Sequence, residues 1–321
     1  MSVRAASLLW RGLRRRRLGR YDRETLRLFR RAHRTGDHHA LLHYVQFRRD
    51  LGHALHPRFV EPLLDAFPRL TQGQQWRAGA LLREIGADPP WIWQHLKPGP
   101  GLAAAKHQGH WRAGLCNALR ERQRAGIVVV GNANSLLGTN VGRIIDRGGL
   151  VLRFNDTGDL AERAAHLGQR TDVWVTSPAY HGPTIKKPDW VIVSGPDVCY
   201  TLRDWSLHAG RLRAARPVVT VPLAVWRDLA GALNAPPSAG VLILAWIHAM
   251  LGTWIGVQAA GIGFGIDRRY HHAHRRLRAG SRHDWAAEAD LVDAWTQRGL
   301  RILPESHARR ARPASLVDSR R

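Results

Sequence analysis

The sequence of 321 residues is poor in cysteine, lysine and carboxylate pairs, and each shortage excludes a class of site. Its two cysteines, Cys116 and Cys199, are not spaced as metal ligands and cannot build a disulfide framework, so we expect a reducing, cytoplasmic setting. No Gly-Lys-Ser or Gly-Lys-Thr follows a glycine-rich turn, which excludes a Walker loop. No Asp-x-Asp pair occurs, so we expect neither a divalent metal nor another cofactor.

Positive charge, by contrast, is abundant and is carried almost entirely by arginine. Lysine and arginine number 49 against 25 acidic residues, for a formal net charge of +24. Such a surface attracts polyanions, whether nucleic acid, anionic lipid or phosphorylated glycan, and charge alone does not choose among them. No reader motif and no basic stripe with interleaved aromatics is present, so we predict no specific nucleic-acid partner.

Two segments invite a membrane interpretation. In residues 1–20 a short apolar stretch, Ala5–Trp10, precedes most of the arginines, which is the wrong order for a signal peptide. We predict a disordered basic tail, with peripheral contact at the anionic inner membrane face as the alternative. Residues Val241–Gly265 contain no charged side chain, but His248, Gln258 and the closing glycines favour a buried helix, a turn and a buried strand over a transmembrane span.

The spacing of apolar residues divides the chain into a helical part and an α/β part. Residues 21–96 carry apolar residues at helical spacing, which predicts an accessory helical domain. The breaker-rich stretch near Lys97–Gly101 predicts a linker over 97–110, and a basic tail is expected over 311–321. Between them, over 111–310, short apolar runs alternate with helical or loop segments, typical of a mainly parallel, Rossmann-like sheet of about seven strands covered by helices. The runs are Ile127–Val130, Leu150–Phe154, Val173–Thr176, Trp190–Ser194, Pro217–Val221, Val257–Gly263 and Leu300–Leu303.

Polar residues that suit a nucleotide follow the first two of these runs. The first run ends in Gly131, Asn132 and Asn134, where glycine leaves room for a ligand and asparagine offers both a donor and an acceptor. The second run carries Arg153 and ends in Asn155. Further along, Ser238 and Gly240 open a long apolar helix whose free amides and dipole could hold a phosphate. In parallel sheets ligands bind beyond the carboxyl ends of the strands.

Taken together, four stretches resemble the sialylmotifs of the sialyltransferase family, in the family's order. Val128–Asn155 resembles the large motif, and Pro237–Gly265, with its closing Gly-Phe-Gly, resembles the small motif. His283 and Glu288 match the His-x4-Glu of the very small motif, and Tyr270–His274 sits where the third motif is found. The resemblance covers roughly residues 127–303 and leaves the N-terminal third unmatched.

The resemblance implies a GT-A-like fold and an inverting, metal-independent transfer of sialic acid or Kdo from a CMP-sugar to a glycan or glycolipid hydroxyl. It assigns donor binding to Gly131, Asn132, Asn134 and Asn155 and to Ser238 and Gly240. The general base would be His283, with His271 or His272 facing the donor phosphate. Glu288 would orient neighbouring groups, and we interpret Asp146 and Arg153 as mainly structural. A histidine suits the base role because its pKa lies near neutrality.

Three departures from the family pattern are visible. Neither the large nor the small motif contains the cysteine that forms a disulfide in the animal enzymes, which agrees with a bacterial, reducing setting. The third motif lacks its tyrosines, so its register stays open among His271, His272 and His274. Ala239 replaces a usual threonine or serine. The alternatives are a catalytically inactive nucleotide-binding relative and a polyanion-binding protein.

Overall fold

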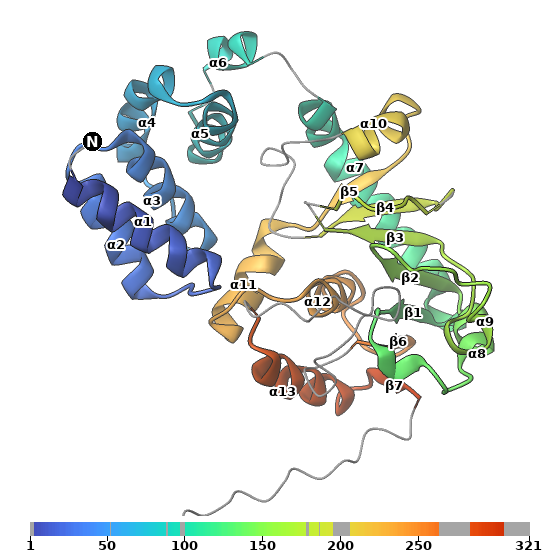
Figure 1. Ribbon diagram of the computed structural model, residues 1–321. Helices are drawn as coiled ribbons and strands as arrows, with labels where there is room; N and C mark the ends of the chain where they lie inside the picture. Colours follow the sequence, from blue (N-terminus) through green and yellow to red (C-terminus); the bar gives the residue numbers. More distant parts are fainter. Residues whose placement is uncertain are drawn as a thin grey trace, which may run out of the picture.

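The fold is taken from a computed structural model in which residues 3–51, 53–87, 89–96, 100–177, 180–185, 187–194, 206–262 and 283–304 are described. Figure 1 shows a helical part, α1 to α6, beside an α/β part that contains all the labelled strands. The helices of the first part are α1 (Val3–Arg17), α2 (Arg23–His33), α3 (His38–Asp50), α4 (Val60–Ala66), α5 (Gln72–Ile85) and α6 (Pro90–His95), with single 3-10 turns at Pro57–Phe59 and Phe67–Arg69.

The N-terminal residues form a packed helix, so the prediction of a basic tail over 1–20 was wrong. Helix α1 buries Ala5, Leu8 and Leu9 on its inner face. It lies so close to α2 that a Cβ on Gly12 would collide with the ring of Phe29. The alternation of apolar and arginine residues that looked like a tail is therefore an amphipathic helix whose apolar side meets a neighbour, and local composition alone does not distinguish the two.

Helix α7 (Pro100–Arg122) replaces most of the predicted linker at 97–110. Pro100 stands at the first helical position, where its missing N–H costs nothing, so the breakers mark the start of a helix. Gln108 accepts a hydrogen bond from the amide of Thr220 (2.8 Å) and donates one to the carbonyl of Val218 (2.9 Å). These bonds attach α7 to the edge of the sheet, which makes it part of the α/β domain.

The α/β part is built on one seven-stranded sheet in the order β5-β4-β3-β2-β1-β6-β7, with every neighbouring pair parallel. This confirms the predicted fold class, and each strand lies within one of the seven apolar runs. The strands are β1 (Ile127–Val130), β2 (Leu150–Phe154), β3 (Val173–Thr176), β4 (Trp190–Val193), β5 (Val218–Thr220), β6 (Val257–Ala260) and β7 (Arg301–Leu303).

Both faces of the sheet are buried, which explains why its strands read as continuous apolar runs. Alternate residues of β1 belong to different cores: Ile127 and Val129 join the large one, and Val128 and Val130 the smaller one. The smaller core is completed by apolar residues of α8 (Gly142–Asp146) and α9 (Ala164–Leu167). The other helices of this part are α10 (Ser206–Arg213), α11 (Leu223–Leu233), α12 (Ala239–Leu251) and α13 (Trp285–Thr296), with 3-10 turns at Gln123–Ala125 and Asn134–Leu136.

The uncharged stretch from Val241 is a buried helix followed by a buried strand, as predicted. Helix α12 ends at Leu251, Gly252 caps it in the left-handed conformation, and β6 begins at Val257. Within the described part of the chain, no helix has the length and apolar character needed to cross a membrane.

Candidate functional site

The order of the strands makes the carboxyl edge of the sheet beside β1 the expected place for a ligand crevice. Strand β1 lies between β2 and β6, so the chain that leaves β1 continues on one side while its last strands add on the other. At such a switch point the loops diverge and leave room for a ligand. The register aligns Val130 with Arg153 on β2 and with Ala260 on β6. The segments that begin at Gly131, Asn155 and Gly261 therefore leave the sheet side by side.

A neighbouring loop requires glycine at position 131. A Cβ at this position would collide with the carbonyl oxygen of Gly261. Two hydrogen bonds join the segments. The amide of Gly131 donates to the carbonyl of Ala260 (2.7 Å), and the amide of Ala133 donates to the carbonyl of Gly261 (2.9 Å). This contact explains why the position is glycine, and the donor-binding role of Gly131 stays a prediction.

Asn132 and Asn155 hold the ends of β1 and β2 in place. The Asn132 side-chain amide donates to the carbonyls of Phe154 (2.9 Å) and Asp156 (3.3 Å). Asn155 adopts a left-handed backbone (φ 46°), and its side-chain oxygen accepts from the amide of Ser177 after β3 (2.9 Å). Each side chain thus uses one of its two polar groups on the backbone. Among the described residues, these bonds use the Asn132 amide nitrogen and the Asn155 oxygen, and not the Asn132 oxygen or the Asn155 amide nitrogen.

The N-terminus of α12 is joined to α13 by a buried carboxylate. Oε1 of Glu288 accepts a hydrogen bond from the backbone amide of Ser238 at 2.6 Å, between residues 50 positions apart. The side chain of Glu288 is fully buried, and its Oε2 has no hydrogen-bond partner in the described structure. Burial raises the pKa of Glu288, while the hydrogen bonds with Ser238 oppose the shift.

Ser238 and Gly240 both have structural contacts at the start of α12, and their donor-binding role stays a prediction. The amide of Ser238 is occupied by Glu288, and its hydroxyl caps the helix by accepting from Val241 at 3.4 Å. Gly240 approaches the loop after β6, since a Cβ there would lie 3.1 Å from Ile262. This contact places the start of α12 at the crevice. The first-turn amides of Ala239 and Gly240 have no acceptor within the helix, so they are the groups that can receive an anion.

His283 lies directly before α13, and its ring orientation is set by the backbone. Nδ1 lies 2.8 Å from the carbonyl oxygen of Pro236, two residues before Ser238. A carbonyl can only accept, so Nδ1 carries the proton and Nε2 is the basic nitrogen of the neutral ring. The ring also meets the edge of Trp285 at a centroid distance of 5.2 Å. His283 and Glu288 thus both attach α13 to the segment that begins α12.

Arg153 and Asp146 make contacts typical of structural residues. The guanidinium of Arg153 is buried and donates to the carbonyls of Arg170 (2.8 Å) and Leu167 (2.6 Å). Burial lowers its pKa to about 10, although Asp146 acts in the opposite sense. Asp146 accepts from the backbone amides of Gln169 and Arg170, both at 2.9 Å. Together they fix the loop between α9 and β3.

The remaining predicted site residues either take no part in these contacts or lie outside the described residues. Asn134 begins the 3-10 turn Asn134–Leu136 after β1 and is partly exposed. His271, His272 and the alternative His274 lie outside the described residues. Sequence reasoning missed Pro236, whose carbonyl orients His283, because a backbone acceptor leaves no trace in residue type. It also missed Ser177, although the polar residue after β3 was a usable signal.

No group of three or more histidine, cysteine, aspartate or glutamate side chains with metal-binding proximity occurs among the residues that the structure describes. The described polar groups at the crevice are instead amides, a histidine and a carboxylate that binds a backbone amide. Such a set can hold a nucleotide, bind an anion at a helix N-terminus and accept a proton.

Part of the chain is similar to known proteins. Residues 116–191 match the model of glycosyltransferase family 29, the sialyltransferases. A crystal structure of a mammalian sialyltransferase in complex with Gal-beta-1-3GalNAc-ortho-nitrophenol is 18% identical, with a TM-score of 0.41, covering 62% of this chain and 84% of that chain. A second mammalian sialyltransferase structure is 19% identical, with a TM-score of 0.41, covering 59% and 78%. None of the curated protein sequences compared with the chain matches it.

The matched segment contains β1, α8, β2 and β3 and reaches the first residues of β4, and it therefore includes both strand ends that carry Asn132 and Asn155. This part of the chain, which includes the stretch that resembles the large sialylmotif, is similar to glycosyltransferase family 29, the sialyltransferases.

Proposed function

We propose that this protein is an inverting, metal-independent glycosyltransferase that moves an acidic keto-sugar, sialic acid or Kdo, from a CMP-sugar to a glycan hydroxyl. The observation that carries the proposal is the family match over residues 116–191, which includes the strand ends with Asn132 and Asn155. The geometry supports it further, because a helix N-terminus and a histidine with a defined tautomer adjoin the same crevice.

The donor would lie across the carboxyl edge of the sheet. The Asn132 oxygen and the Asn155 amide nitrogen suit the base or ribose of CMP, since each presents a polar group that the backbone does not use. The donor phosphate would bind at the N-terminus of α12, where the amides of Ala239 and Gly240 and the helix dipole favour negative charge. This charge stabilisation would assist departure of CMP without a metal ion.

His283 would act as the general base. As the acceptor oxygen bonds to the anomeric carbon, its proton passes to Nε2, and the bond from that carbon to the phosphate oxygen breaks with its electron pair leaving on CMP. The carbonyl of Pro236 keeps the proton on Nδ1 and stabilises the imidazolium that forms. Glu288 would position rather than transfer protons, because its described contact is with a backbone amide.

A thermal-shift comparison of CMP, CDP, UDP and GDP at moderate salt tests the proposal. A ligand that binds only the folded state raises the melting temperature, and we expect CMP to do so selectively. Equal shifts with all four nucleotides would indicate attraction by the basic surface. A selective CMP shift without transfer or donor hydrolysis would identify an inactive relative.

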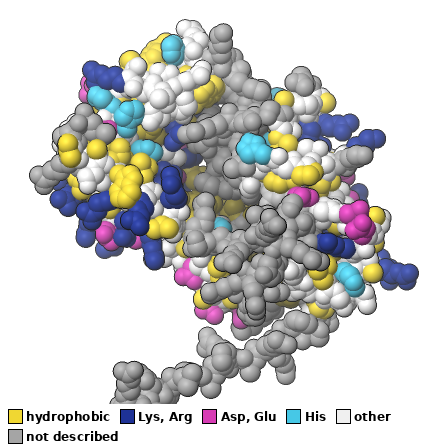
Figure 2. Space-filling view, in the orientation of Figure 1, with side chains coloured by type: hydrophobic (Ala, Val, Ile, Leu, Met, Phe, Trp, Pro, Cys, Tyr) yellow, Lys and Arg dark blue, Asp and Glu magenta, His cyan; other side chains and the backbone are white. Residues whose placement is uncertain are grey.

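The outer face of α1 supports a further proposal, contact with an anionic membrane surface. Val3 and Trp10 of this helix, and Leu18 directly after it, have exposed side chains, with exposed fractions of 89%, 59% and 54%. The inner face of the same helix is closely packed. Arginines surround them, and Arg14 stacks over the Trp10 ring at 5.6 Å. Figure 2 shows basic and hydrophobic side chains together over this helical part. Apolar side chains amid arginines fit the boundary between lipid headgroups and acyl chains.

A further inference from the structure

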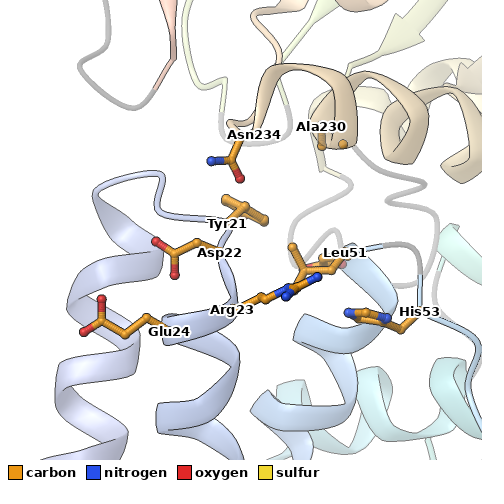
Figure 3. Close-up of a pocket in the computed structure, with 10 residues that line it drawn as sticks. Tyr21, Asp22, Arg23, Glu24, Leu51, His53, Ala230 and Asn234 are labelled. Atoms are coloured by element: carbon orange, nitrogen blue, oxygen red, sulfur yellow. The ribbon is translucent and has the colours of Figure 1, made fainter.

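A cavity of about 550 Å³ lies between the helical part and α11. The helical part contributes both acidic and basic residues to its lining, and α11 contributes Gly231 and its C-cap residue Asn234. The charged or titratable residues of the lining are Asp22, Arg23, Glu24, Asp50 and His53. Figure 3 shows Asn234 reaching toward Tyr21, with Asp22 next to Tyr21. Such concave sites between two parts of a chain are where small ligands usually bind.

The two walls of the cavity are held together by the first turns of α11. The ring of Trp226 meets Tyr21 edge-on at 5.6 Å. Arg227 donates to the carbonyl of Arg49 (2.7 Å) and pairs with Glu84 (2.8 Å). One and two turns later the same stripe of α11 presents Ala230, Gly231 and Asn234. The large residues Trp226 and Arg227 dock α11 on the helical part, and the small residues Ala230 and Gly231 that follow on the same face leave the cavity open.

The cavity adjoins the candidate base. Asn234 is two residues before Pro236, so the Cα atoms of Asn234 and Pro236 lie at most about 7 Å apart. The carbonyl of Pro236 is the group that bonds His283. The backbone of Asn234 is left-handed (φ 49°), and it is here that the chain turns from α11 toward α12. The short segment from Asn234 to Pro236 therefore links the lining of the cavity to the residue that orients His283.

The polar groups of the cavity are pre-positioned acceptors. Asp22 accepts from the amide of Thr25 (2.8 Å) and from Arg15 (2.7 Å), and Asp50 pairs with Arg16 (2.8 Å). Burial opposes ionisation of Asp22, but its hydrogen bonds with Thr25 and Arg15 outweigh this and lower its pKa. Each of the three carboxylates at the cavity is paired with an arginine, Asp22 and Glu24 with Arg15 and Asp50 with Arg16, and Arg23 also lines the cavity. Fixed carboxylates accept hydrogen bonds from sugar hydroxyls, and because the arginines balance their charge, the cavity suits a neutral, hydroxyl-bearing ligand.

We propose that this cavity binds the acceptor as a neutral saccharide, and that the helical part, which the family match does not include, supplies one wall of the acceptor site. The inference rests on the proposed function, because it assumes that His283 deprotonates the acceptor. It gives Asn234 and the carboxylates of the helical part the task of orienting the acceptor.

Filling the cavity tests the proposal. A Cβ at Gly231 meets no atom within 4 Å, so Gly231→Trp can place its ring in the cavity without disturbing the helix. Gly210 in α10 is equally open and exposed, and Gly210→Trp is the matched control. Asn234→Gly removes the amide while keeping the left-handed backbone, so it tests the same wall with little strain.

Each variant is measured in three ways at constant salt: the thermal shift with CMP, the hydrolysis of CMP-sialic acid and CMP-Kdo without acceptor, and binding to an array of neutral, sulfated and phosphorylated oligosaccharides with CMP present. We expect wild type and Gly210→Trp to bind neutral glycans. Gly231→Trp should lose this binding, and Asn234→Gly should weaken it by about tenfold, the effect of one or two lost hydrogen bonds. CMP shifts and hydrolysis should stay within about twofold of wild type.

The outcomes separate the two ideas. If CMP gives no selective shift in wild type, the proposed function fails. If CMP binds but no neutral glycan shows binding that Gly231→Trp removes, or if only acidic glycans bind, the cavity is not the acceptor site.

Discussion

Replacement of Glu288 tests whether one buried carboxylate joins the two helices of the site. In Glu288→Ala the buried amide of Ser238 loses its acceptor, which costs about 1–3 kcal/mol. Removal of one buried methylene group, Cγ, adds about 0.8 kcal/mol. The free energy of unfolding should therefore fall by about 2–4 kcal/mol. Glu288→Gln keeps an oxygen at the position of Oε1, so its loss should be about 1 kcal/mol or less.

The pH dependence adds a second signature. The pKa of Glu288 in the folded protein is raised by burial, so between the ordinary glutamate pKa and the raised value the folded state holds a proton that the unfolded state has lost. Across that interval the free energy of unfolding falls as pH rises, and above it the contribution is constant. Glu288→Gln removes this contribution, so the difference between wild type and Glu288→Gln should change with pH in that interval only.

Urea denaturation between pH 4 and pH 8 at fixed ionic strength measures both effects. The reasoning would be refuted if Glu288→Ala unfolds within about 1 kcal/mol of wild type, because the buried Ser238 amide would then have another acceptor. It would equally be refuted if Glu288→Gln were as unstable as Glu288→Ala, since the charge would then matter more than the hydrogen bond.

Three further predictions follow from the site and from α1. His283→Ala should lower kcat by about 10² to 10⁴ while leaving the CMP thermal shift unchanged, because a base acts in the transition state; retention of more than a tenth of the turnover would exclude it as the base. EDTA should leave transfer unchanged, and activity lost on chelation and restored by Mn²⁺ or Mg²⁺ would disprove the metal-free mechanism. The double variant Trp10→Ala, Leu18→Ala should bind vesicles containing phosphatidylserine roughly tenfold or more weakly, from lost apolar burial. Ile255→Ala, which removes an equally exposed apolar side chain from the α/β part, is the control and should bind as wild type does; equal loss in both, or no loss, would reject the membrane face.

The sequence by itself determined the strands and the edge of the sheet that carries the site. Parallel strands buried on both faces must be apolar at successive positions, so β1 to β7 were visible as runs between breakers. The carboxyl ends of parallel strands share one edge, which is why Asn132 and Asn155 could be placed near each other before any coordinates. The uncharged stretch from Val241 was likewise readable as a helix and a strand, because His248, Gln258 and the closing glycines do not suit a transmembrane span.

Only the tertiary structure decided which residues contact each other across long separations in the sequence. Glu288 binds Ser238 50 residues away and His283 bonds Pro236 47 residues away, and residue type at either position does not encode such partners. The fate of residues 1–20 was decided in the same way, since an arginine-rich amphipathic helix becomes ordered only when a neighbour such as Phe29 covers its apolar side. The cavity beside Asn234 arises from the docking of α11 on the helical part, and a space between two surfaces has no counterpart in either sequence segment.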